Sequence, residues 1–145
     1  MLRLTKIFHF EMAHAIDGYP GACRNIHGHS YELHVSVTDR NNNGDNYFPA
    51  PGILLDFKEL KQLVNTAIIN KFDHQLILSE QFIQARVPVL SHENLFVLEA
   101  EPTAENLLIF IRRNLETALP AGIELASLKL FETKDSYAEW INDNI

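Results

Sequence analysis

Two histidines one residue apart, preceded by the only cysteine of the chain, are the residues most suited to chemistry. His27 and His29 flank Gly28, Cys23 lies just upstream, and His14 comes earlier in the sequence. Three imidazoles can hold a zinc ion and leave its fourth position open for water or substrate. A cysteine beside such a site need not be a ligand, because its thiolate can also move protons. This pattern predicts an enzyme.

The spacing of the two neighbouring histidines favours a shared metal ion over two unrelated side chains. Extended backbone sends residues i and i+2 to the same side, so the rings of His27 and His29 can converge. Zinc is the usual ion for an all-imidazole tetrahedral site, although iron, nickel and copper also accept imidazole. The other histidines outside these motifs, His9, His34 and His92, show no such pairing and are expected to be ordinary.

Cys23 lies in a polar loop, which is unusual for a structural thiol. As a lone cysteine it excludes an intramolecular disulfide and fits a reducing compartment. Three roles are open: an inert thiol, a fourth metal ligand that would close the site, or a proton acceptor or nucleophile. We favour the last, because Arg24 and a nearby metal would both stabilise the thiolate. Arg24 is also a candidate contact for a phosphate group.

Asp73 and His74 form a second candidate group, directly after a predicted helix. A carboxylate next to an imidazole can orient the ring and stabilise its cationic form. Histidines are also common at helix C-termini for dipole reasons alone. The pair is therefore a functional candidate only if it acts together with Cys23.

Glu132 is expected to point toward the apolar side of a strand, since it shares parity with Leu128 and Leu130. A buried carboxylate needs a partner. That partner is either the amidine-like edge of a heterocyclic ligand, which binds a carboxylate with two hydrogen bonds, or Lys129 or Lys134. The remaining alternative is that Glu132 lies at the edge of the strand and is exposed to water.

The composition narrows the classes of function. Of 145 residues, 46% are hydrophobic and 21% charged, which suits one domain spanning residues 1–145. The formal net charge of −7 argues against non-specific nucleic-acid binding, which needs a basic surface. No apolar stretch reaches the length of a membrane span, and no signal peptide is recognisable. We therefore expect a cytoplasmic protein with neither membrane nor nucleic-acid partners.

Hydrophobic periodicity predicts the elements that position these groups. Four strands are expected, at residues 2–10, 29–37, 125–133 and 136–140. Two helices are expected, one capped by Asp56 and the other capped by Thr103 and ended by Pro120 and Gly122. The segment 73–101 is the least regular, with a short strand at 96–98. The order ββααββ predicts an α+β domain, an antiparallel sheet with two helices on one face.

These motifs together resemble the family of 6-pyruvoyltetrahydropterin and 6-carboxytetrahydropterin synthases over nearly the whole chain. In chain order they are Phe10-Glu11-Met12-Ala13-His14, Cys23 to Tyr31, Asp73-His74, Pro102-Thr103-Ala104-Glu105-Asn106 and Phe131-Glu132-Thr133. The combination in this order is specific, whereas each dipeptide alone is not.

The resemblance implies a tunnelling fold (T-fold), in which strands of three subunits form a barrel with helices outside. Trimers of this kind commonly stack into hexamers, with active sites between subunits. Three residues would bind Zn²⁺: His14, His27 and His29. Cys23 would accept a proton, helped by Asp73 and His74 of a neighbouring subunit. Glu132 would anchor the pterin ring, with Thr103 and Glu105 near it.

The implied substrate is 7,8-dihydroneopterin triphosphate. Three residues, Arg24-Asn25-Ile26, separate Cys23 from His27, as in bacterial 6-carboxytetrahydropterin synthases of the queuosine (7-deazaguanine) pathway. This predicts a carbon–carbon lyase that releases acetaldehyde and triphosphate. One alternative is a 6-pyruvoyltetrahydropterin synthase, a phosphorus–oxygen lyase that eliminates triphosphate only. A remoter alternative is a non-catalytic binding module stabilised by zinc. The segment after Asp73-His74 is longer than in compact members, which bears on the pocket wall.

Overall fold

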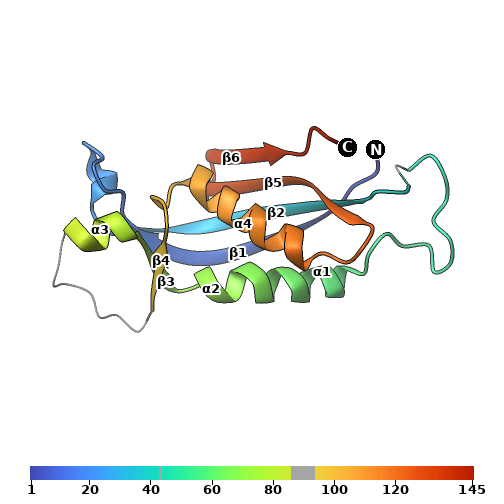
Figure 1. The fold of residues 1–145 in the computed structure, drawn as a ribbon, viewed down its shortest axis with the longest axis horizontal. Helices are drawn as coiled ribbons and strands as arrows, with labels where there is room; N and C mark the ends of the chain where they lie inside the picture. Colours follow the sequence, from blue (N-terminus) through green and yellow to red (C-terminus); the bar gives the residue numbers. More distant parts are fainter. Residues whose placement is uncertain (43, 86–93) are drawn as a thin grey trace.

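The structure is a computed structural model that describes residues 1–42, 44–85 and 94–145. Its centre is a six-stranded sheet in the order β4-β3-β1-β2-β5-β6 (Figure 1). The strands are β1 (Leu4–His14), β2 (His27–Asp39), β3 (Gln75–Ser79), β4 (Leu95–Leu98), β5 (Ile123–Thr133) and β6 (Ser136–Ile141).

The two central strands, β1 and β2, form an antiparallel pair whose alternation is the one expected from the sequence. The register runs from Leu4 opposite Val37 to His14 opposite His27. Phe10 is buried and stacks on Tyr31 across the ladder, with ring centroids 5.2 Å apart. Because side chains alternate along a strand, this face is apolar and the opposite face is polar.

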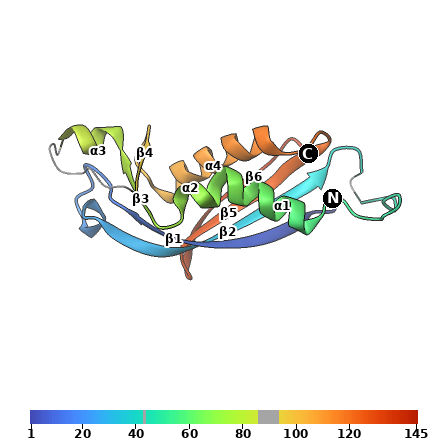
Figure 2. The ribbon, with the colours of Figure 1, turned by 90° about the horizontal axis from the view of Figure 1, so that it is seen from below.

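Two helical segments cover the apolar face of the sheet, which curls beneath them (Figure 2). The first comprises α1 (Phe57–Val64), a π-helical turn over Asn65–Ile69 and α2 (Asn70–Phe72), and the second is α4 (Ala104–Ala118). Both predicted caps are confirmed. Asp56 accepts from the backbone N–H of Lys58, and Thr103 accepts from that of Asn106. Within the described residues, no helix is both long and apolar enough to cross a membrane.

The expected α+β arrangement is confirmed for four strands and two helices, but the sheet is mixed rather than wholly antiparallel. β3 runs parallel to β1, and β4 runs parallel to β3. The short strand expected at 96–98 lies within β4, whereas β3 and the short helix α3 (Glu80–Ala85) were not predicted. Residues 76–79 are all buried, so β3 shows no alternation. His92 lies outside the described residues.

Phe72 joins the helical layer to the sheet. It is fully buried, and its ring lies near those of Phe10, Phe96 and Phe110, with centroids 6.0, 5.7 and 5.3 Å away. The cluster therefore connects β1, β4, α2 and α4 through one side chain.

Replacing Phe72 with alanine should lower the free energy of unfolding by about 3–5 kcal/mol, because it leaves a cavity among these rings. Phe57→Ala is the matched control, since Phe57 is 51% exposed at the start of α1. Its cost should stay below about 1 kcal/mol. Urea unfolding followed by circular dichroism measures both, and equal losses would contradict the central role of Phe72.

Candidate functional site

The register of β1 and β2 brings three histidines together on the helix-covered face of the sheet. His14 pairs with His27, and His29 lies two residues further along β2. The ring centroids of the three are 4.6–5.2 Å apart. One nitrogen from each ring lies within 4.8 Å of the others, so the three residues could hold a metal ion.

Hydrogen bonds to carbonyl oxygens fix the protonation of two of these rings. His14 donates from Nδ1 to the carbonyl of Pro102 at 2.7 Å, and His27 donates from Nδ1 to that of Asn25 at 2.7 Å. Because a carbonyl only accepts, Nδ1 carries the proton in both rings and Nε2 of a neutral ring is left with a lone pair. The two Nε2 atoms face each other at 3.1 Å.

This geometry fits a bound cation. Two lone pairs at that distance repel each other unless a proton or a metal lies between them, and nitrogen ligands of a tetrahedral zinc ion lie about 3.3 Å apart at bonds of about 2.0 Å. His29 Nε2 is buried without a hydrogen-bond partner in the described part of the chain. Burial lowers the pKa of His14, against the hydrogen bond to Pro102 that raises it, so this ring favours its neutral, metal-binding form.

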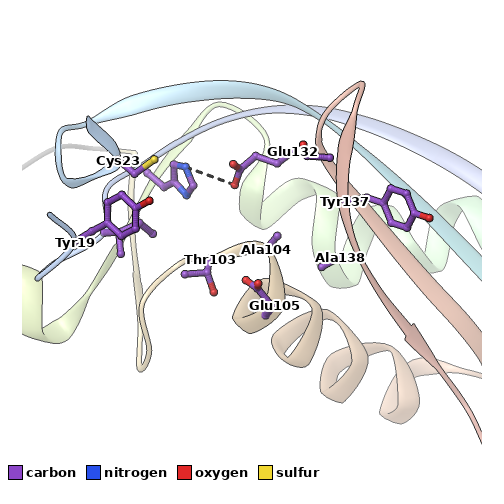
Figure 3. A pocket seen from close by; sticks show the side chains of 11 residues that line it. Tyr19, Cys23, Thr103, Ala104, Glu105, Glu132, Tyr137 and Ala138 are labelled. Carbon is purple, nitrogen blue, oxygen red and sulfur yellow. Dashed lines mark ion pairs between the residues drawn. The ribbon is translucent and has the colours of Figure 1, made fainter. Parts of the chain in front are cut away.

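A pocket of about 300 Å³ opens beside the histidines. Cys23 and Glu132 lie on its sheet side, whereas Thr103, Ala104 and Glu105 lie on its helix side, at the start of α4 (Figure 3). Its lining thus combines one thiol, two carboxylates and the first turn of a helix. Most of the residues predicted for substrate and proton transfer share this space.

Cys23 is carried by residues 15–26, which connect β1 to β2 and are called the Cys23 loop below. Its side chain is half-buried, and its carbonyl accepts from the backbone N–H of Ile16 at 2.9 Å, which closes the loop on itself. Arg24 is exposed beside it and lies outside the lining of the pocket. The phosphate contact suggested for Arg24 stays a prediction.

Glu132 faces the histidines rather than a lysine. Its carboxylate oxygens lie 3.6 Å from His29 Nε2 and 3.9 Å from His14 Nε2, while Lys129 pairs with Glu139. Burial, together with the Glu132 carboxylate, raises the pKa of Tyr31 beneath the site. The Tyr31 hydroxyl therefore stays protonated.

Asp73 and His74 lie outside the lining of the pocket that contains Cys23. Asp73 accepts from the backbone N–H of Glu11, which lowers the pKa of its carboxyl group, and it lies 3.0 Å from His74 Nδ1. The side chain of His74 is 78% exposed and lines a second cavity with Glu11 and Ser30. Within one chain, the pair is thus oriented but does not line the pocket of Cys23.

Several residues of the pocket were not predicted. Tyr19 of the Cys23 loop and Ser136, Tyr137 and Ala138 of β6 line it alongside the predicted groups. Tyr19 could have been suspected, since it lies close to Cys23 in the sequence. The β6 residues follow Glu132 across a tight turn, and only the pairing of β5 with β6 brings them to the pocket.

Comparison with known proteins places this chain in a family. Residues 3–142 match the 6-pyruvoyl tetrahydropterin synthase family. A protein of Haemophilus influenzae named 6-carboxy-5,6,7,8-tetrahydropterin synthase is 31% identical over 147 residues, covering 97% of this chain and 99% of the relative. A Rickettsia bellii protein of the same name is 27% identical over 143 residues, covering 96% and 99%.

The fold is shared with solved members. The 6-pyruvoyl tetrahydropterin synthase of Caenorhabditis elegans superposes with a TM-score of 0.69 at 18% identity, covering 98% of this chain and 96% of that one. The expected T-fold is therefore confirmed.

Removing one imidazole of the cluster should abolish tight metal binding. His27→Ala leaves two ligands, and we expect the affinity for Zn²⁺ to fall by more than about 100-fold, beyond the usual effect of losing an outer-shell partner. His9→Ala is the matched control, because His9 is 69% exposed and pairs with Glu32. Competition with a chromophoric chelator measures the affinity. Parent-like binding by the His27 variant would contradict the assignment.

Proposed function

This chain belongs to the 6-pyruvoyl tetrahydropterin synthase family, and we propose that it is a 6-carboxy-5,6,7,8-tetrahydropterin synthase. In this proposal residues 1–145 form one catalytic domain that converts 7,8-dihydroneopterin triphosphate to 6-carboxytetrahydropterin, releasing acetaldehyde and triphosphate in queuosine biosynthesis. The choice of product rests on the names of the relatives and on the short spacer between Cys23 and His27.

One observation carries the proposal. The cluster of His14, His27 and His29 borders a pocket that also holds the only thiol of the chain and the carboxylate of Glu132. A metal site, a proton acceptor and a carboxylate for ring N–H groups are the parts that this reaction needs. They meet at one end of the sheet, at the start of α4.

We assign the metal to zinc, held by the three histidines. Zinc bound by these residues would supply a Lewis acid that lowers the pKa of hydroxyl groups on the substrate side chain. The protein orients the ligands through the carbonyls of Pro102 and Asn25, and the burial of His14 keeps that ligand neutral.

The remaining groups bind the substrate and move protons. Cys23, which lies in the Cys23 loop and lines the pocket, accepts a proton from the substrate side chain. Glu132 accepts two N–H groups of the pterin ring, an arrangement that matches a carboxylate to an amidine-like edge. Thr103 and Glu105 contact the ring from the start of α4.

We further propose that Asp73 and His74 serve the pocket of a neighbouring subunit. His74 is held by Asp73 yet points away from the pocket of its own chain into solvent. Both edges of the sheet carry exposed apolar side chains, Val97 on β4 and Tyr137 and Ile141 on β6. Open edges of this kind pair with other strands. A trimer or a hexamer of stacked trimers would close them.

The compartment follows from the thiol. A catalytic cysteine without a disulfide partner suits a reducing environment, so we place the reaction in the cytoplasm. The net charge of −7 suits a small-molecule substrate better than a nucleic acid.

Product identification tests the function directly. Incubation of the zinc-loaded protein with 7,8-dihydroneopterin triphosphate should release acetaldehyde and give 6-carboxytetrahydropterin by mass spectrometry. A Cys23→Ala variant should lose at least about 100-fold in kcat, the usual contribution of a proton-transfer group. A 6-pyruvoyl product without acetaldehyde would favour the alternative enzyme of this family. No turnover, with unfolding on chelation, would favour a binding module.

Mixing two inactive variants tests the shared site. Cys23→Ala and His74→Ala should each be inactive alone. If a pocket takes its thiol from one subunit and its imidazole from another, random reassembly in equal amounts restores about a quarter of the parent activity. Two groups that act within one chain would give no recovery, because every chain lacks one of them. Refolding the mixture from urea and measuring turnover distinguishes the two cases.

A further inference from the structure

The carboxylate of Glu101 bridges two segments that are far apart in the sequence. One oxygen accepts from the backbone N–H of Asp17 at 2.8 Å, at the start of the Cys23 loop. The other accepts from the hydroxyl of Ser79 at 2.5 Å, at the end of β3. Ser79 is itself 2% exposed, and its oxygen accepts from the backbone N–H of Phe82 at 2.9 Å. The bridge is therefore anchored in a buried part of the structure.

The backbone around Glu101 holds other parts of the site. Its carbonyl accepts from the backbone N–H of Thr103 and from the side-chain amide of Asn106, which fixes the start of α4. The carbonyl of the next residue, Pro102, orients the ring of His14. One short segment thus contacts the Cys23 loop, the histidine cluster and the helix that forms the opposite side of the pocket.

A small apolar cluster supports the same junction. Ala15, the first residue of the Cys23 loop, is fully buried among Leu76, Leu78 and Phe82 of β3 and α3. Figures 1 and 2 both show this loop beside β3 and α3 at one end of the molecule. The elements β3 and α3, which were not predicted from the sequence, therefore pack against the start of the Cys23 loop and support it.

We propose that Glu101 is a positioning residue that fixes the Cys23 loop, and with it the thiol of Cys23, relative to the histidine cluster. The proposal rests on the proposed function in taking Cys23 as the reacting thiol. It assigns a role to two residues of the segment between Asp73-His74 and Pro102: Ser79 and Glu101 hold the loop in place.

Two substitutions of Glu101 distinguish the effect of its two hydrogen bonds from the effect of its negative charge. Glu101→Asp keeps the charge but is one methylene shorter, so it cannot reach both Asp17 and Ser79. Glu101→Gln loses the charge but keeps the length, because its oxygen can accept from Asp17 while its amide donates to Ser79. Glu99→Asp is the matched control, since Glu99 is 76% exposed and pairs with Arg113.

The rate of alkylation by iodoacetamide measures the position of the thiol without any pterin substrate. Cys23 is the only cysteine, so all label reports on this loop. We expect zinc-loaded Glu101→Asp to be labelled at least about tenfold faster than the parent, because the loop opens locally. Its kcat should fall about 10- to 100-fold with little change in KM, as expected for a misplaced group. Glu101→Gln and Glu99→Asp should be labelled at the parent rate.

Low concentrations of urea distinguish local release from general destabilisation. Labelling through a released loop stays nearly independent of urea, whereas labelling through global unfolding rises with the slope of the unfolding transition. The proposal is overturned if Glu101→Asp is labelled no faster than the parent or if its excess rate follows that slope. If Glu101→Asp does not fold, Ser79→Ala is read in the same way, since it detaches the carboxylate from β3. A protein with another substrate would still show the labelling difference, so failure of the proposed function is seen separately.

Discussion

The pairing of β1 with β2 is the constraint on which the site depends. In this register His14 lies opposite His27, and the stacked rings of Phe10 and Tyr31 lie four residues further along the two strands, in the core. A slip of one residue would turn every side chain of a strand to the opposite face of the sheet. The apolar contacts that hold the register therefore also hold the three imidazoles together, and Tyr31 takes part in both, since its ring centroid lies 5.6 Å from that of His29.

The elements with one covered and one open face were predictable from the sequence. β1, β6 and the first half of β2 show the alternation of a half-buried strand, and the caps Asp56 and Thr103 mark the starts of their helices. β3 was missed because it is packed on both sides: Ile77 belongs to the main core, and Leu76 and Leu78 belong to the second cluster. Burial on both faces removes the period of two that identifies a strand.

The site was predictable where its geometry is local or its residues form recognisable motifs. The spacing of His27 and His29 on one strand is sufficient to place both rings on one face. Tyr137 and Glu101 carry no such signal, because strand pairing and side-chain contacts between distant segments determine their positions. Arg24 shows the converse: its neighbours in the sequence are site residues, yet it is exposed outside the pocket.

The backbone conformation of His74 limits which residues fit at this position without strain. Its φ of +61° lies in the left-handed region, where glycine is favoured and a side chain is strained. The turn is pinned on both sides, since the N–H of His74 donates to Glu11 and its carbonyl accepts from Asn94. Glycine at this position would relieve the backbone strain but would remove the imidazole. Stability and the role proposed for His74 therefore make opposite demands on one residue.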